Sequence, residues 1–345
     1  MPNLDLDLKT SPNQVFEIVD YSAKWDGAWD GLVARAEAGT FLHTRRFLSY
    51  HRARFQDCSL LALRKGNLVA VFPAALVPDA SSLTIASHPG ATFGGVVQDG
   101  SIRPDEMIVL LEQIIGYLQE AFGMKQLYYK PVPLIYHRNP VQSDLYALFR
   151  LNTSRWRCDL SSTISLEHRG NLSQRRRRVL KKATSAGLTL EAGAEHYADF
   201  WKILSENLQL KYGKQPVHTV EEILELQKRF PEEIELITSW DGKQLIAGAV
   251  MFYSRTVAHA QYLAANDRGR ELGGLDLVIE SCIQSASKNN FRFFDFGIST
   301  DHDGLFLNNG LCAYKTEFGS GTTIYESYLF RNQTDRTATP NPDLP

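Results

Sequence analysis

The sequence predicts a mixed α/β (α+β) fold made of two similar units. Alternation of apolar and polar residues with period two, typical of half-buried strands, occurs in residues 59–77 and again in residues 235–265. Each stretch leads into a glycine-containing loop, an amphipathic helix and a further strand. A chain of 345 residues with 43% hydrophobic residues is long enough for two such domains. We therefore expect two tandem domains, residues 1–155 and 156–330, each a mixed, mostly antiparallel sheet flanked by helices.

The first half reads in order as helices, a hairpin, a loop, a helix and a strand. Residues 14–54 predict two short helices separated at Gly39-Thr40, and residues 59–77 predict a hairpin that turns at Gly66-Asn67. A strand and a glycine-rich loop follow. The helix from Pro104 to Phe122 has a proline in its first turn and ends at Gly123, and residues 125–133 form the next strand.

The second half begins with a Pro-rich loop, a short strand (RWRCDLS) and a basic helix that Gly187 ends. Two more helices are expected over Phe200–Leu210 and Thr219–Phe230, the latter with Thr219 as N-cap. Three strands within residues 235–265, a basic glycine loop, a helix and the strand FRFFDFG come next. A loop leads to the final strand, and residues 331–345 are expected to be a polar, flexible tail.

Composition excludes several classes of function. The net charge of −2 argues against a protein that mainly neutralises a nucleic-acid backbone. The four cysteines have no C-x-x-C pairing, and the nine histidines show no ligand spacing, so we expect no metal. No signal peptide pattern or long apolar run is present, which favours a cytoplasmic protein without membrane insertion.

Three stretches carry a resemblance to a known family. They are the basic helix RRRRVLKKATSAG, the unit QYLAANDRGRELGGLDLVIESCIQSASKNNFRFFDFG and the closing YKTEFG. The second half resembles a GCN5-related N-acetyltransferase (GNAT) domain. The tandem arrangement, from about Phe41 to Phe330, resembles the Fem family of aminoacyltransferases and related bipartite N-acyltransferases, some of which act on nucleotide-linked amino sugars.

The resemblance implies an acyl-CoA co-substrate held by the second domain. In a GNAT fold the strand before the pyrophosphate loop separates from its neighbour, and its free backbone amides hold pantetheine and polarise the thioester carbonyl. By position that strand is 258–265 and the loop is 268–274. The implied cofactor-binding residues are Gln261, Arg268, Gly269, Arg270, Gly273 and Gly274.

Four residues are candidates for the chemistry. Lys315 in YKTEFG matches a lysine that in Fem-like enzymes lies near the reacting carbonyl, where its charge stabilises the oxyanion. Asp295 lies in an apolar strand, and is either paired structurally or used as a base. His302 has a suitable intrinsic pKa for a base. Tyr262, at the centre of the separating strand, is either catalytic or a packed aromatic.

The acceptor is expected on the first domain. Loop residues of that domain and the basic helix suit recognition of a nucleotide-linked amino sugar for a surface polysaccharide such as an O-antigen, because arginines can bind its diphosphate. His88 could alternatively shape the turn before Pro89, and the basic helix could be a solvated charged face. The proposed acceptor-binding residues are His88, Thr92, Phe93, Tyr136, Arg138, Arg175 and Arg178.

Two other functions remain open from the sequence. A Fem-like aminoacyltransferase would take its donor from aminoacyl-tRNA and modify a peptidoglycan precursor, and the same arginine helix would serve tRNA. A non-catalytic binding protein with a decayed GNAT site is the other, because Leu275 stands where the pyrophosphate loop usually ends in glycine or alanine.

Overall fold

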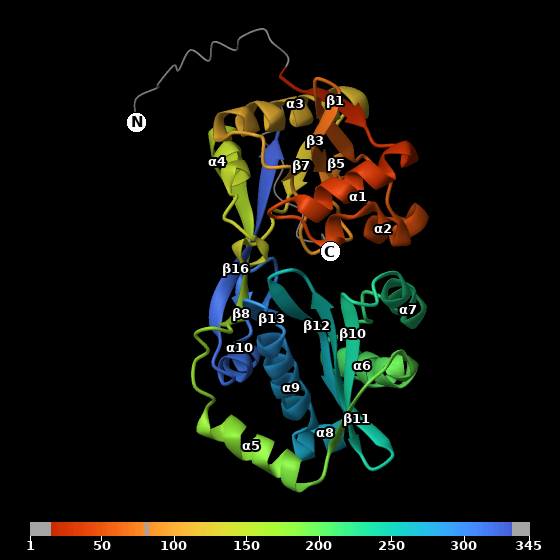
Figure 1. Ribbon diagram of the computed structural model, residues 1–345, viewed down its shortest axis with the longest axis vertical. Coiled ribbons are helices and arrows are strands. Elements are labelled where there is room, and N and C mark those ends of the chain that lie inside the picture. The colour runs from red at the N-terminus through yellow and green to blue at the C-terminus, as the bar shows by residue number, and fades with distance from the viewer. Residues whose placement is uncertain (1–14, 79, 81–82, 333–345) are drawn as a thin grey trace.

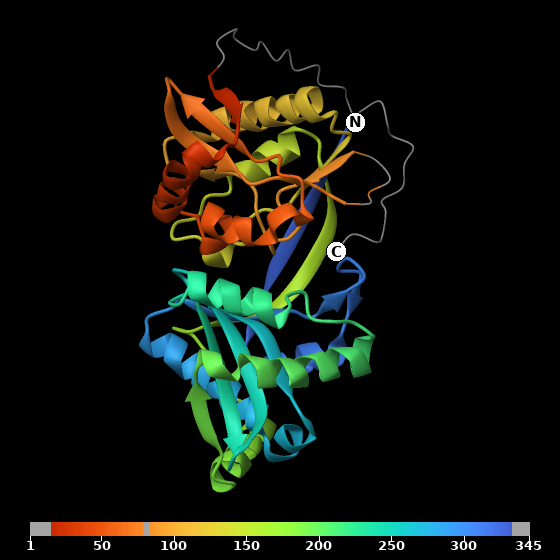
Figure 2. The same cartoon turned by 90° about the vertical axis from the view of Figure 1, so that its right-hand side faces the viewer.

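The computed structural model describes residues 15–78, 80 and 83–332. Figure 1 shows two lobes stacked along the long axis, with the first half of the chain in one lobe and most of the second half in the other. Two long strands, β8 (Ser154–Ser165) and β16 (Gly321–Arg331), run side by side and join the lobes. Figure 2 shows the same two strands crossing between the lobes from the side.

The N-terminal lobe follows the sequence pattern closely. The hairpin turns at Lys65 and Gly66, whose φ angles are 52° and 77°, one residue earlier than expected. The long helix ends at Gly123, in the left-handed conformation that glycine adopts without strain. Its elements are β1 (Glu17–Asp20), α1 (Asp26–Arg35), α2 (Arg45–Leu48), β2 (Leu60–Arg64), β3 (Asn67–Phe72), β4 (Ala75–Leu76), β5 (Thr84–Ala86), β6 (Val97–Gln98), α3 (Pro104–Phe122), β7 (Gln126–Tyr129) and α4 (Ser143–Arg150).

The C-terminal lobe contains the expected strands, loop and helix in order. Thr219 accepts a hydrogen bond from the Glu222 amide and caps its helix as predicted. The elements are α5 (Gln174–Ser185), β9 (Thr189–Ala192), α6 (Tyr197–Tyr212), α7 (Val220–Arg229), β10 (Ile234–Asp241), β11 (Gln244–Tyr253), β12 (Val257–Ala265), α8 (Asp267–Leu272), α9 (Gly274–Lys288), β13 (Phe293–Ile298), β14 (Thr300–Asp301), β15 (Phe306–Leu307) and α10 (Asn309–Thr316).

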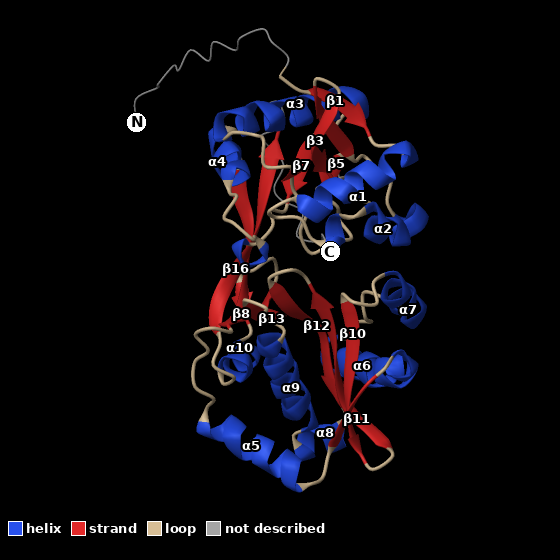
Figure 3. Cartoon of the chain, viewed as in Figure 1, coloured by secondary structure: helices blue, strands red, loops and turns tan. Residues whose placement is uncertain are grey.

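One ten-stranded sheet runs through both lobes, in the order β4-β5-β7-β16-β8-β13-β12-β11-β10-β9 (Figure 3). Each lobe contributes one parallel pair joined by a helix, β5 with β7 and β12 with β13. This repeated strand–helix–strand unit confirms the predicted two-copy fold. A second sheet, β1-β2-β3-β6, covers part of the N-terminal lobe.

The last strand of the chain returns to the N-terminal lobe. β8 opens the second half and pairs with β13 of the same half, whereas β16 closes the chain and pairs with both β8 and β7. The N-terminal lobe's part of the sheet is therefore completed by a strand from the second half of the sequence. The chain cannot be cut at the expected boundary after residue 155 without cutting β8.

The structure differs from the sequence prediction in several elements, among them helix α8, which forms in the loop expected over residues 268–274. Residues 17–20, expected in a helical region, form strand β1 against β2. Helix α4 lies in a stretch expected to be loop, and α10 lies in the loop expected before the last strand, where Asn308 caps it by accepting from the Leu311 amide. Of the expected tail, residues 333–345 lie outside the described residues.

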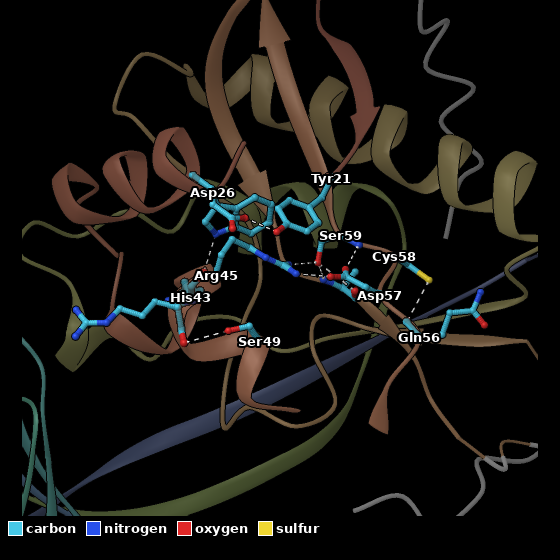
Figure 4. Close-up of polar contacts among 12 residues, drawn as sticks. Tyr21, Asp26, His43, Arg45, Ser49, Gln56, Asp57, Cys58 and Ser59 are labelled. Atoms are coloured by element: carbon cyan, nitrogen blue, oxygen red, sulfur yellow. Dashed lines mark hydrogen bonds and ion pairs between the residues drawn. The ribbon is translucent and has the colours of Figure 1, made fainter. Parts of the chain in front are cut away.

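A buried arginine ties α2 to the start of β2. Figure 4 shows the Arg45 guanidinium pointing at Asp57 and Ser59, with the Tyr21 ring beside it. The guanidinium carbon lies 3.5 Å from the Tyr21 ring centroid, a cation–π contact. This cluster fixes α2, whose other side faces the C-terminal lobe.

Aromatic packing joins the lobes opposite the shared strands. The ring of Phe41 lies 5.2 Å from that of Phe230 and 5.5 Å from that of Phe252. Ion pairs from Arg52 to Glu225 and from Arg54 to Glu222 flank these rings. The lobes are thus held together on two sides, and a cavity lies between them.

Candidate active site

The candidate site is a cavity of about 320 Å³ between the lobes. The N-terminal lobe supplies the loop Pro89–Phe93 and Lys130, and the C-terminal lobe supplies Gln261, Ile298 and His218. The shared strands form the remaining wall. Their lining residues are Trp156, Arg157 and Asp159 of β8 and Tyr325, Glu326 and Ser327 of β16. Among the residues predicted from the sequence, Thr92, Phe93 and Gln261 line this cavity.

Strand β12 is irregular where it reaches the cavity. It pairs with β13 through Val257–His259, and the ladder stops there although β12 continues to Ala265. Against β11, Tyr262 faces Val250 and Ala260 faces Met251, so Gln261 is an extra, bulged residue. Beyond His259, the backbone groups of β12 that face β13 make no ladder hydrogen bonds to it. Their N–H groups can therefore donate to a carbonyl placed between the two strands.

Asp295 on β13 is fully buried and accepts four hydrogen bonds. The donors are the hydroxyls of Ser161 at 2.6 Å, Thr163 at 2.7 Å and Tyr325 at 2.8 Å, and Nδ1 of His259 at 2.8 Å. Burial alone would raise the pKa of Asp295, but the bond and charge of His259 and the hydroxyl donors outweigh it and lower the pKa. The carboxylate is thus ionised, and it already accepts four hydrogen bonds. This favours a structural role for Asp295 over a role as a catalytic base.

Tyr325 connects this carboxylate to the cavity. Its hydroxyl donates to Asp295 and lies 3.0 Å from the hydroxyl of Tyr136 in the N-terminal lobe. Burial, then the charge of Asp295, raises the pKa of Tyr325 well above the ordinary value. Asp295 therefore fixes the orientation of a neutral tyrosine that lines the cavity.

Lys315 is buried at the end of α10. Its ammonium donates to the carbonyl oxygens of Gly297 at 2.8 Å and Ile298 at 2.7 Å, at the end of β13. Burial lowers the pKa of Lys315 to about 8, against the opposing charge of Asp295. Because Ile298 lines the cavity, Lys315 places a positive charge directly behind the cavity wall rather than within it.

A hydrogen-bonded chain crosses from β12 to the N-terminal lobe. The Tyr262 hydroxyl lies 2.6 Å from Nδ1 of His218, and Nε2 of His218 lies 3.0 Å from the Tyr50 hydroxyl. Burial lowers the pKa of His218 to about 4, so the imidazole is neutral at pH 7. His302, by contrast, is exposed, packs near Phe306, and is not among the cavity-lining residues.

The expected pyrophosphate loop is packed against other parts of the chain. Arg268 pairs with Asp241 and Glu271, and Arg270 bonds to Asn207, Asp267 and the Ala265 carbonyl. Gly269 lies so close to the Ile246 carbonyl that an added Cβ would be 2.2 Å from its oxygen. The arginines expected to bind an anion are thus already engaged within the chain.

Helix α5 covers the N-terminus of α9. A Cβ on Gly273 would lie 2.5 Å from Cγ1 of Val179, and the ammonium of Lys182 donates to the Glu271 carbonyl. Asp276, in the first turn of α9, forms a buried ion pair with Arg176. An acid therefore lies in the first turn of α9, next to the loop where the resemblance placed a CoA pyrophosphate.

The other predicted acceptor residues are spread over the molecule. His88 is buried beneath the cavity loop with its ring stacked on that of His51. Arg138 pairs with Glu37 and its carbonyl accepts from Arg292 of the C-terminal lobe, so it lies where the lobes meet but does not line the cavity. Arg175 and Arg178 are exposed on α5, at the end of the C-terminal lobe farther from the N-terminal lobe (Figure 1).

Sequence reasoning missed several residues at the cavity, among them Lys130, Arg157, His218 and Tyr325. Lys130 has a weak signal, since it is a lone lysine that ends the apolar strand QLYY directly before a proline. His218 and Tyr325 carry no such signal in the sequence. His218 precedes an ordinary helix N-cap, and Tyr325 lies in a regular strand. Their positions at the cavity arise from the return of β16 to the N-terminal lobe and from the packing of the lobes against each other.

Among the helices that the structure describes, none combines the length and apolarity needed to cross a membrane. The same residues contain no group of three or more His, Cys, Asp or Glu side chains placed to hold a metal ion.

Comparisons with known proteins agree with this architecture. Residues 167–316 match the family Acetyltransferase (GNAT) domain. FemX is structurally similar, with a TM-score of 0.66 and 12% identity over 92% of this chain and 98% of that one. A tandem GNAT protein from the clavulanic acid biosynthesis pathway has a TM-score of 0.53 and 10% identity over 92% and 98% of the two chains.

L-PGS from Bacillus licheniformis is also similar, with a TM-score of 0.54 and 9% identity over 78% of this chain and 82% of that one. The comparison with curated proteins gave no match. Residues 167–316 of the chain therefore match a GNAT acetyltransferase domain, and the chain as a whole has a fold similar to those of FemX and the tandem GNAT protein.

Proposed function

We propose that this protein is an N-acyltransferase that acylates an amine bound in the cavity between the lobes. The observation that carries the proposal is the bulged, separated end of β12 opening into a cavity whose other walls bear Lys130, Arg157 and Tyr325. A donor carbonyl placed between β12 and β13 would face the backbone groups outside the ladder. An acceptor amine in the cavity would then lie within reach of it.

Residues of this chain would act mainly by positioning and electrostatics. Placing two reactants in one cavity can lower the barrier by about 7–11 kcal/mol, which exceeds the effect of a typical single general base. Gln261 would hold the donor at the bulge. Lys315, through the carbonyl groups of Gly297 and Ile298, would hold the end of β13 in place beside the reacting carbonyl.

The sequence-based acceptor, a nucleotide-linked amino sugar, is retained as the first acceptor class to test. Its support now rests on Arg157 at the cavity, since Arg138, Arg175 and Arg178 do not line it. Arg157 is paired with Asp159 and Asp303 but remains at the cavity wall, where a phosphate could share its guanidinium.

The acyl-CoA donor expected from the sequence depended on the loop 268–274, which is packed and paired internally. A second candidate is therefore a Fem-like transferase that uses aminoacyl-tRNA. The exposed face of α5 favours it, because Arg175, Arg177, Arg178 and Lys181 all point to solvent on one helix. In this candidate the acceptor is the amine of a peptidoglycan precursor.

The experiment pairs each donor with each acceptor. Purified protein is incubated with short acyl-CoAs or with aminoacyl-tRNA, and with dTDP- or UDP-linked amino sugars or a peptidoglycan precursor, and the products are analysed by mass spectrometry. An acylated amine is the expected result, and the productive pair identifies donor and acceptor. If no pair gives an acylated amine, the proposal is contradicted.

A further inference from the structure

Lys130 has an unusual position at the end of β7. Its backbone amide donates to the Ser87 hydroxyl at 2.7 Å, and its carbonyl accepts from the Gly94 amide at 2.9 Å, so the loop that lines the cavity holds it on both sides. The side chain is half-buried and lines the cavity. Its ammonium nitrogen donates to the Ala91 carbonyl at 2.5 Å.

No carboxylate among the described residues lies within 4.0 Å of the Lys130 nitrogen. The nearby charged group on β8 is Arg157, which is itself paired with Asp159 and Asp303. Burial, and then the charge of Arg157, lowers the pKa of Lys130 to about 7. A neutral amine that donates one hydrogen to Ala91 keeps its lone pair free.

The other titratable groups around the cavity have their lone pairs engaged. Both ring nitrogens of His218 are hydrogen-bonded, and Asp159 pairs with Arg157 and accepts from Thr300. Glu326 pairs with Arg155, and Tyr325 donates to Asp295. Among the described lining residues, Lys130 is thus the basic group best able to accept a proton.

Two buried histidines lie close to Lys130 from the N-terminal lobe. The rings of His51 and His88 stack with centroids 4.8 Å apart, and burial lowers the pKa of both. Both are therefore neutral at pH 7. They add no charge beside Lys130 in the range where its own amine titrates, so its titration depends mainly on burial and on Arg157.

Building on the proposed function, we propose that Lys130 is the general base that takes the proton from the acceptor amine. The amine nitrogen bonds to the donor carbonyl carbon, and the extra proton on nitrogen passes to the Lys130 nitrogen. The bond between that carbon and the donor's leaving oxygen or sulfur then breaks. The Lys130 ammonium returns the proton to the leaving group, which restores the neutral lysine.

The first arm of the test needs no substrate. The intact protein is treated with a trace of acetic anhydride at several pH values, and acetylation at each lysine is measured by peptide mass spectrometry. At pH 7 we expect Lys130 to react about tenfold or more faster than the exposed Lys65 and Lys243, because an ordinary lysine is almost wholly protonated there. Labelling of Lys130 no faster than these two would overturn the proposal.

The second arm uses the productive donor and acceptor. Lys130→Met should lower kcat by about 10²-fold or more with little change in KM, and should remove the acidic limb of the pH–rate profile near pH 7. Lys130→Arg should be equally inactive, because a guanidinium is not a base at this pH. Near-normal activity of Lys130→Arg would mean that Lys130 binds an anion, and would refute its role as a base.

The two arms separate the possible failures. If the wild-type protein transfers no acyl group, the proposed function fails, while the labelling arm still decides whether a reactive, neutral lysine lies in the cavity. Circular dichroism and thermal unfolding of both variants verify folding. Lys243→Met, at an exposed position in the turn between β10 and β11, is the matched control and should leave kcat unchanged.

Discussion

At the scale of single residues, Asp295 organises the wall of the candidate site. One carboxylate fixes Ser161 and Thr163 on β8, His259 on β12 and Tyr325 on β16. These residues come from three strands that meet at the centre of the shared sheet. Its ionised, fully bonded state explains how an acid can lie buried in the apolar strand FFDFG.

Asp295→Asn should lower the free energy of unfolding by about 3 kcal/mol, because an amide group turns its own donors toward hydroxyl and imidazole donors. Urea unfolding measures this loss. The exposed Asp301→Asn is the control, and should change stability by no more than about 0.5 kcal/mol. Equal stability of the two variants would contradict the assigned role.

His51 supports a prediction of the opposite sign. It is buried among Phe47, Tyr50, Phe55 and His88, and neither of its ring nitrogens has a hydrogen-bond partner among the described residues. A buried unpaired polar group lowers stability. His51→Leu should therefore raise the free energy of unfolding by about 1 kcal/mol, measured by urea unfolding at pH 7. A loss of stability would show that the ring nitrogens are satisfied.

At the scale of elements, the contact of α5 with the α8–α9 junction decides whether a phosphate can bind there. Gly273 has φ 81° and lies against Val179, so a side chain at this position is disfavoured both by its backbone conformation and by the contact. The sequence suggested that these glycines leave room for a cofactor. In the structure Gly273 leaves room for helix α5, and Gly269 and Gly274 leave room for Ile246 of β11.

A double-mutant cycle separates the two effects at Gly273. Gly273→Ala should lower the free energy of unfolding by about 2 kcal/mol, and Val179→Ala in the same protein should recover part of that loss by removing the contact. The remaining deficit, about 1 kcal/mol, reflects the left-handed backbone. Strict additivity of the two substitutions would show that α5 does not pack on this glycine.

Most elements could be predicted from the sequence because their signals are local. Pro104 and Gly123 mark the ends of α3, and Thr219 with Glu222 marks the start of α7. The pairing of β16 with β7 and β8 could not be predicted, because pairing partners far apart in sequence leave no local pattern. Thr92, Phe93 and Gln261 could be placed at the site because their loop and strand have local patterns. Lys130, His218 and Tyr325 could not, because only long-range pairing and packing bring them to the cavity.

At the scale of the whole molecule, buried histidines make stability depend on pH. Burial lowers the pKa of His43 and His218 to about 4 and of His51 to about 3, from 6.5 when unfolded. At pH values between the folded and unfolded pKa values, the unfolded chain binds more protons than the folded chain. Stability therefore falls as pH decreases from about 6.5 to 4. Asp144 opposes this trend, because burial raises its pKa to about 6.

Burial also lowers the pKa of His88 and His137 and raises that of Asp30 and Asp276, so five histidines stand against three carboxyls. The free energy of unfolding should therefore fall by up to about 3 kcal/mol per pH unit within this range. Urea unfolding from pH 7 to pH 4.5 measures the slope. His51→Leu should make the slope shallower, since one titrating group is removed. A stability that stays constant across this range would contradict the assigned burial of the histidines.

The central claim is that acyl transfer takes place in the cavity between the lobes. The most direct measurement compares the acyl-transfer rate of Thr92→Trp, which fills the cavity from an exposed loop position, with that of Leu210→Trp on the exposed face of α6. We predict that Thr92→Trp lowers kcat/KM by about 10²-fold without loss of folding, whereas Leu210→Trp matches the wild type. Full activity of a folded Thr92→Trp protein would contradict the claim.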